Sequence, residues 1–167
     1  MLKFATLLQF REKYEKAKKE TFTYEGLGFP IRLIDVPMKK MCGEWVIDID
    51  MMELQLVVLR YLAYKPTRLT KDELRFIRKF LVLTTSDFGQ MFGVTHAAVL
   101  QWENGKRRLT PSTEFCIRLR ILSHLRAKDK ECRNLYNTVS LEKLSHGEPK
   151  KIVLLKIDAS ENLKIAL

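Results

Sequence analysis

The order of apolar and polar residues predicts a helix near the start of the chain. Within residues 3–19, apolar side chains recur near helical spacing, and lysine and glutamate fill most of the other positions. The apolar positions that carry this pattern are Phe4, Leu7, Leu8 and Tyr14. We interpret the charged run EKYEKAKKE, residues 12–20, as a solvated face in preference to a nucleic-acid-binding arm.

A different pattern follows, in which glycines and prolines interrupt short apolar runs. It argues against a helix and predicts strands at 31–36 and 44–49, with 38–42 as a candidate strand between them. Because proline has no N–H to donate to a neighbouring strand, we expect Pro37 at a strand end or on an edge strand. Near the end of the chain, the run KIVLLKIDA predicts another strand, which follows a helix near 129–144.

Capping signals define the helices between these regions. Asp50 begins an Asp-x-x-Glu sequence ahead of the apolar run LQLVVLRYLAY, and Pro66 ends that helix because it disfavours helical geometry in the residue before it. Four short helices are then predicted, of which the first starts with a capping box and the last with proline at its first position. Their N-cap residues are Thr70, Thr84, Thr95 and Thr110. Gly93 and Gly105 end the second and third, since glycine readily adopts a positive φ.

The second and third of these short helices have the size and the tight turn of a helix-turn-helix unit. Val94, Val99 and Trp102 are expected to pack the two helices together. The opposite face of the third helix carries Thr95, His96, Ala97, Leu100 and Gln101. A major groove admits one α-helix, and its base edges present a distinguishable pattern of donors and acceptors. The spacing therefore predicts a helix that reads DNA.

Each residue type on this face has a matching group on a base. Gln101 can pair bidentately with adenine, His96 can donate to or accept from a base edge, and Thr95 or Ala97 can touch a thymine methyl. Leu100 has two interpretations, which are contact with a thymine methyl and local packing. Phosphate contacts are expected on the flanks, from the start of the preceding helix and from the basic run after the reading helix. These residues are Thr84, Thr85, Ser86, Lys106, Arg107 and Arg108.

The basic residues are concentrated in the same part of the chain. The net charge is +10, and residues 65–126, with 12 basic and 5 acidic side chains, carry +7 of it. Residues 1–64 and 127–167 carry only +1 and +2. A local positive field favours a polyanionic partner, because neutralised phosphates release their counterions. The alternative interpretation is a solvated basic face.

Several other classes of protein are disfavoured. No apolar run approaches the roughly 18 residues that span a bilayer, and the opening MLKFATLLQF lacks the cleavage pattern of a signal peptide. Cys42, Cys116 and Cys132 form no CxxC pair, so neither a disulfide framework nor a metal site is expected. No Ser-His-Asp order or Gly-rich phosphate loop indicates catalysis. We therefore expect a cytoplasmic protein, nucleoid-associated when bound to DNA, that is not an enzyme and has no cofactor.

The stretch TSDFGQMFGVTHAAVLQWENGKR, residues 85–107, resembles the helix-turn-helix of the XRE family, the class of Cro and the phage repressors. The Gly-Val-Thr turn and the Trp-Glu-Asn-Gly-Lys end carry the resemblance. It implies base-reading sites at Thr95, His96, Ala97 and Gln101. It implies phosphate-contacting sites at Thr84, Thr85, Asn104 and Lys106.

The wider arrangement is similar to bacterial antitoxins of the MqsA type. In that family the N-terminal region binds a toxin, and a helix-turn-helix dimer represses its own operon. The family's N-terminal zinc finger uses paired CxxC motifs, which this chain lacks. Because of this departure, the resemblance supports the prediction of toxin binding less than the prediction of DNA binding.

These observations predict a mainly α protein with a small α+β N-terminal region and a helix-turn-helix domain of the Cro and phage-repressor type. The expected parts are 1–64 for dimerisation or partner binding, 65–128 for DNA binding, and 129–167 as a C-terminal helix and strand extension. The expected function is sequence-specific transcriptional regulation, as a repressor on double-stranded DNA. The alternatives are an antitoxin that neutralises a toxin and represses its own operon, and a purely structural helical domain.

A homodimer on a palindromic operator is expected for two reasons. Two reading helices spaced about one helical turn apart on DNA make such short helices sufficient. In addition, the apolar strands in GFPIRLIDV and KKIVLLKIDA have no obvious partners in the sequence, and unpaired strands seek edges.

Overall fold

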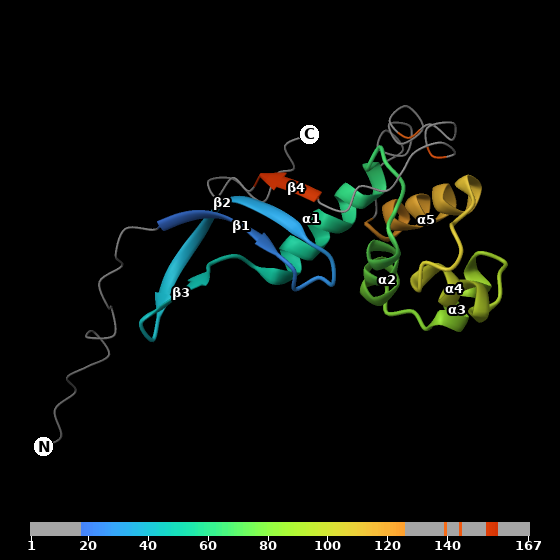
Figure 1. Cartoon of the computed structure of the whole chain (residues 1–167), viewed down its shortest axis with the longest axis horizontal. Helices are drawn as coiled ribbons and strands as arrows, with labels where there is room; N and C mark the ends of the chain where they lie inside the picture. Colours follow the sequence, from blue (N-terminus) through green and yellow to red (C-terminus); the bar gives the residue numbers. More distant parts are fainter. Residues whose placement is uncertain (1–17, 126–138, 140–143, 145–152, 157–167) are drawn as a thin grey trace, which may run out of the picture.

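We describe the protein from a computed structural model, in which residues 18–125, Val139, Leu144 and 153–156 are described. These residues form five helices and a four-stranded sheet (Figure 1). The strands are β1 (Lys18–Tyr24), β2 (Ile31–Met41), β3 (Glu44–Ile47) and β4 (Val153–Lys156). The helices are α1 (Met51–Tyr64), α2 (Lys71–Phe80), α3 (Thr85–Met91), α4 (His96–Glu103) and α5 (Pro111–His124). The predicted combination of helices with a small sheet is confirmed.

β2 is the central strand of the sheet. It pairs antiparallel with β1 and β3 and parallel with β4. The side chains of β2 that are buried against the core are Ile31, Leu33, Val36 and Met38. Strict alternation would turn the last two to the opposite face, because successive side chains of a strand point to opposite sides. The strand therefore needs one extra residue in its middle.

A β-bulge supplies that residue. The register between β1 and β2 shifts where Ile34 and Asp35 together oppose Thr21, and Asp35 has a φ of 57°. The bulge restores the inward direction of the apolar side chains that follow it. The candidate strands at 31–36 and 38–42 are consequently one continuous strand.

Pro37 was wrongly predicted at a strand end or on an edge. It lies within the central strand β2, opposite Lys19 of β1, and its carbonyl accepts a hydrogen bond from the N–H of Asp48 at 2.9 Å. The position tolerates proline because its nitrogen, like its carbonyl, faces the side of β3, and the paired part of β3 ends at Ile47, one residue before the position opposite Pro37.

The predicted helix over 3–19 was wrong at its end, because β1 begins at Lys18. Thr21, Phe22, Thr23 and Tyr24 are β-branched or aromatic residues, which favour a strand once a partner such as β2 is present. The rest of that prediction, residues 3–17, lies outside the described residues. The predicted helix near 129–144 also lies outside them, except for Val139 and Leu144, which are buried.

β4 lies beside the first half of β2, with Val153 opposite Ile31 and Lys156 opposite Ile34. The two apolar segments that were expected to lack partners are therefore partners of each other. The argument for a dimer from unpaired strands was wrong. The division of the chain at residues 64 and 128 stays a prediction, although β4 belongs to the sheet formed by β1–β3.

α1 joins the sheet to the cluster of α2–α5 (Figure 1). Asp50 caps it as predicted, because its carboxylate accepts from the N–H groups of Met52 and Glu53 at 2.7 and 3.3 Å. The buried side of α1 consists of Leu54, Val58, Leu59, Leu62 and Ala63. One apolar core runs from β2 through α1 to α2 and α5, so the sheet and the helical cluster share their interior.

The predicted starts and ends of the short helices are confirmed. Each N-cap threonine accepts a hydrogen bond from the backbone N–H three residues further on, and Thr70 and Thr84 have complete capping boxes. Gly93 and Gly105 have φ values of 67° and 70°. Since non-glycine residues avoid this region, both positions favour glycine.

Candidate nucleic-acid interface

α3 and α4 are joined by a tight turn that depends on a close backbone contact. A Cβ atom built on Gly89 of α3 would lie 2.7 Å from the carbonyl oxygen of Val94 in the turn. The N–H of Val94 donates to the carbonyl of Gly89 at 2.9 Å. Phe88, next to Gly89 in α3, is buried and meets the ring of Phe92 edge to face, with 4.9 Å between ring centroids. The absence of a side chain at Gly89 therefore brings the start of α4 against α3.

The outer face of α4 is exposed, as the spacing predicted. The exposed candidate residues are Thr95, His96, Ala97 and Gln101. Val99 and Trp102 lie on the opposite side and are 0% and 5% exposed. Leu100 is 43% exposed, which favours an outward apolar contact over local packing. α4 thus divides cleanly into a buried half and an open half.

Two arginines of α2 hold the end of α4. Arg78 donates from Nε and Nη2 to the two carboxylate oxygens of Glu103 at 2.6 and 2.9 Å. Arg75 donates to the carbonyl of Glu103 at 2.6 Å. Hydrogen bonding to this buried carboxylate raises the pKa of Arg78. Because bidentate arginine pairs fix direction as well as distance, α4 is oriented by α2 as well as by its own apolar side chains.

The candidate phosphate-contacting residues at the start of α3 have different surroundings. The hydroxyl of Thr84 lies 2.6 Å from a carboxylate oxygen of Asp87 and accepts from the N–H of Asp87 at 3.1 Å. In the described part of the chain, the N–H groups of Thr85 and Ser86 have no acceptor, as is usual in a first turn. These two N–H groups can donate hydrogen bonds to a phosphate, whereas the negative charge of the Asp87 carboxylate would repel it.

The segment after α4 folds back on the helix. The N–H groups of Lys106 and Arg107 both donate to the carbonyl of Gln101, at 2.9 and 3.2 Å. Residues 104–108 are all exposed, and those with side chains are Asn104, Lys106, Arg107 and Arg108. Three exposed basic residues therefore follow α4 closely in the sequence.

The positive charge of this region lies on the surface. Within residues 65–125, the buried charged side chains are three cations and three carboxylates, which cancel. They are Lys65, Arg68, Arg118, Glu73, Glu103 and Glu114. The net charge of +6 in this segment is consequently carried by side chains that are not buried.

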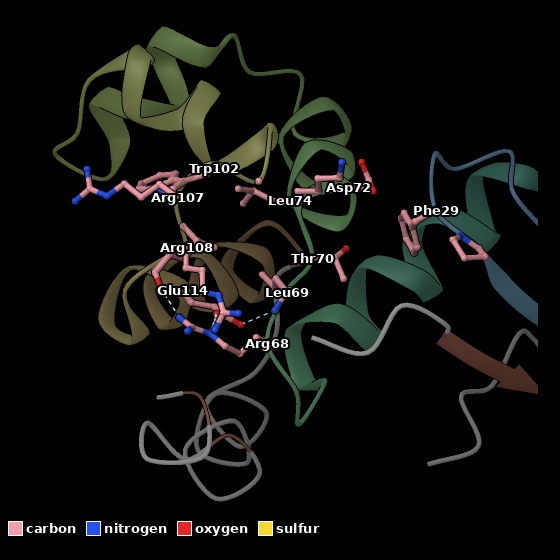
Figure 2. Close-up of a pocket in the computed structure, with 14 residues that line it drawn as sticks. Phe29, Arg68, Leu69, Thr70, Asp72, Leu74, Trp102, Arg107, Arg108 and Glu114 are labelled. Carbon is pink, nitrogen blue, oxygen red and sulfur yellow. Dashed lines mark hydrogen bonds and ion pairs between the residues drawn. The ribbon is translucent and has the colours of Figure 1, made fainter. Parts of the chain in front are cut away.

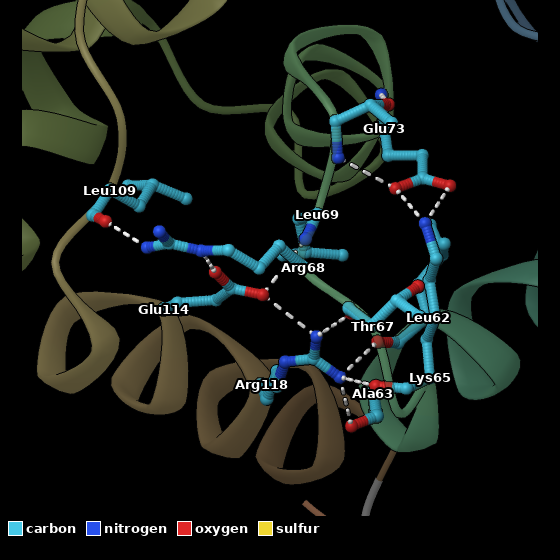
Figure 3. A network of polar contacts seen from close by, with 11 residues as sticks. Leu62, Ala63, Lys65, Thr67, Arg68, Leu69, Glu73, Leu109, Glu114 and Arg118 are labelled. Carbon is cyan, nitrogen blue, oxygen red and sulfur yellow. Dashed lines mark hydrogen bonds and ion pairs between the residues drawn. The ribbon is translucent and has the colours of Figure 1, made fainter. Parts of the chain in front are cut away.

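A buried polar network ties the end of α1 and the linker after it to α5 (Figure 3). Nη1 of Arg118 donates to the carbonyls of Leu62, Ala63 and Lys65 at 3.1, 3.2 and 2.6 Å. Nη2 donates to the carbonyl of Thr67 and to Oε1 of Glu114, both at 2.8 Å. One guanidinium group thus satisfies backbone carbonyls that α1 leaves open at its end.

A second buried pair connects the linker to α2. Nζ of Lys65 lies 2.8 Å from both carboxylate oxygens of Glu73, which also accepts from the N–H of Thr70 at 2.8 Å. Burial lowers the pKa of Lys65, although the carboxylate of Glu73 acts in the opposite direction. Because α2 in turn holds α4 through Glu103, these buried charges belong to the support of the exposed helix.

Comparison of the chain with protein-family models, with curated proteins and with solved structures gave no match. The resemblance to the XRE family therefore stays a prediction from residues 85–107. Among the described residues, no group of three or more His, Cys, Asp or Glu side chains is placed to hold a metal ion. The same part of the chain contains no helix long and apolar enough to cross a membrane.

Sequence reasoning missed the residues that position α4. Gly89 carried a signal, since a glycine inside a seven-residue helix indicates a close backbone approach. Arg78 carried none, because it lies 25 residues from its partner Glu103. The basic segment also gave no sign that Arg118 is an interior residue.

Proposed function

We propose that the protein is a sequence-specific DNA-binding transcriptional regulator that reads the major groove with the open face of α4. In this proposal α3 and α4 form a helix-turn-helix unit of the Cro and phage-repressor type. The observation that carries the proposal is the division of the eight-residue helix α4 into a buried and an open half, with cations directly after the open one. A purely structural helix would have no need of both features.

The roles of the residues follow from their exposure. Gln101, His96, Ala97 and Thr95 contact base edges, and Leu100 adds an apolar contact of the kind that a thymine methyl accepts. The cations after α4 and the N–H groups at the start of α3 contact phosphates. Phosphate contacts fix the position of the protein on the duplex, and base contacts select the sequence.

Removal of the cations after α4 tests whether they contact phosphates. We expect replacement of Lys106, Arg107 and Arg108 by Ala to weaken binding to all DNA sequences alike. The dependence of affinity on salt should flatten by about one unit of slope for each lost contact. Fluorescence anisotropy of a labelled duplex at several salt concentrations measures both quantities.

A matched variant loses the same charge elsewhere. Lys19, Arg32 and Arg60 are exposed residues of β1, β2 and α1, and their replacement by Ala should leave the slope nearly unchanged. If both triple variants change the slope equally, the cations after α4 supply a general field and not phosphate contacts.

Gln101→Ala tests base reading. The bound sequence is first selected from a pool of randomised duplexes with the unaltered protein. The variant should then lose about 1–3 kcal/mol of binding free energy on that sequence and almost nothing on random DNA. Gln90→Ala removes another exposed glutamine, from α3, and serves as the control. Equal losses of Gln101→Ala on selected and random DNA would show that Gln101 does not read a base.

We also propose that the protein acts as a homodimeric repressor on a palindromic operator, since two copies of α4 are needed for a long enough site. A symmetric dimer is the commonest oligomer of this kind. Light scattering should give the mass of two chains on the selected duplex. A mass of one chain, with and without DNA at micromolar concentration, would contradict the dimer.

A further inference from the structure

A cavity of about 470 Å³ lies between the linker, α2 and the segment after α4 (Figure 2). Small-molecule sites have volumes of roughly 300–1,000 Å³, so its size suits a small organic ligand. Its buried apolar lining consists of Phe29, Leu69, Leu74, Trp102 and Leu109. All five are buried within the fold, so they present a firm apolar wall.

Cations stand at the edge of this wall. The exposed basic residues that line the cavity are Lys71, Arg107 and Arg108. The two acidic residues of the lining already have cationic partners: Asp72 lies 3.4 Å from Arg75, and Glu114 lies 2.8 Å from Arg118 and 3.5 Å from Arg68, which is also in the lining. The charge balance of the cavity therefore favours an anionic group on the ligand.

We propose that the cavity binds an apolar organic anion, with a carboxylate or sulfonate group on a hydrocarbon body, and that this anion competes with DNA. The body lies against Trp102 and its apolar neighbours, and the anionic group meets the cations at the edge. The competition rests on the proposed function, because Arg107 and Arg108 are then claimed both by the ligand and by DNA phosphates.

The segment after α4 is a wall of the cavity, which couples the two sites. Arg68, in the lining, donates a hydrogen bond to the carbonyl of Leu109, and Gly105 lines the cavity beside Lys71. Arg107 and Arg108 lie between these two points of the segment. A ligand on this wall consequently acts on the cations that follow the open face of α4. By linkage, bound DNA must lower the affinity for the ligand by the same factor by which bound ligand lowers the affinity for DNA.

The probe for the cavity is 8-anilinonaphthalene-1-sulfonate, compared with N-phenyl-1-naphthylamine, which has the same rings without the sulfonate. In the full chain with Trp45→Phe, Trp102 is the single tryptophan and reports binding by energy transfer. We expect saturation at one sulfonate per chain, with affinity about tenfold higher than for the neutral amine. A titration of the unaltered chain by probe emission guards against damage from the substitution. Equal affinities, or no saturation, would overturn the proposal.

Two charge reversals locate the bound probe. Arg107→Glu removes a cation that lines the cavity, whereas Lys106→Glu changes the net charge equally at a neighbouring exposed residue outside the lining. Arg107→Glu should lower the affinity for the sulfonate probe about tenfold, and Lys106→Glu should change this affinity less than about twofold. If the two variants weaken the probe equally, the anion is held by the general field and the assigned site is wrong.

The coupling is read from DNA binding in the same solutions. A saturating concentration of the sulfonate probe should lower the affinity for the selected duplex about tenfold. The neutral amine at the same concentration should leave this affinity unchanged. Sulfonate binding at one site without any DNA binding would leave the cavity assignment standing and remove the proposed function. DNA binding that the bound sulfonate does not change would overturn the competition.

Discussion

Arg118→Met should lower the free energy of unfolding by about 3–5 kcal/mol. Arg118 is 0% exposed, and methionine replaces the aliphatic part of the arginine side chain with an unbranched apolar chain of similar length. The loss therefore reports the guanidinium group. Without it, Glu114 loses its nearer arginine and keeps Arg68, 3.5 Å away, and the carbonyls at the end of α1 lose their donor.

Chemical denaturation of three variants separates the causes of this loss. Arg107→Met is the same substitution at an exposed arginine, and it should change stability by less than about 0.5 kcal/mol. Glu114→Gln combined with Arg118→Met removes the buried carboxylate charge that the single variant leaves without its nearer arginine, so it should recover part of the loss. If Arg118→Met is as mild as Arg107→Met, the network is not a source of stability.

Local signals in the sequence were sufficient for the helices of the 65–125 segment. A threonine cap, a glycine at a positive φ and a proline at the first helical position each act within a few residues, so they are visible without a partner. The same holds for the division of α4, because Val99 and Trp102 recur on one side of a single helix. The exposure of His96 and Gln101 follows from that division.

Features that depend on distant residues could not be read from the sequence. β4 pairs with β2 across most of the length of the chain, and this pairing removed the reason for treating both strands as unpaired. The bulge at Asp35 keeps both halves of β2 on one face, but only the pairing with β1 reveals it. A strand pattern states which residues favour a strand and not which strand lies beside it.

The candidate site was likewise predicted in its exposed part and not in its support. Each exposed residue can be assigned from helical spacing alone, whereas a buried ion pair joins two positions that spacing does not connect. Arg118 is one of the 12 basic residues of 65–126, a segment whose positive charge we attributed to binding a polyanion. The structure corrects this attribution, because three of those residues are buried.

Trp102→Ala should lower the free energy of unfolding by about 3–5 kcal/mol, since truncation of a buried tryptophan leaves a void that the fold fills only in part. Trp102 is 5% exposed, and one side of it already borders the cavity described above. We therefore expect a loss toward the lower end of this range. Trp102→Phe retains a ring and should lose less. Thermal and chemical unfolding of the purified variants give these values.

The two neighbours Trp102 and Gln101 then separate folding from reading. Trp102→Ala should weaken selected and random DNA by the same factor, because α4 loses its support against the core. Gln101→Ala should leave the unfolding transition in place and weaken the selected sequence alone, since its side chain is exposed. Both variants are measured by anisotropy below their unfolding transitions. If Trp102→Ala stays folded and loses only the selected sequence, Trp102 acts on a base and its assignment to the core is wrong.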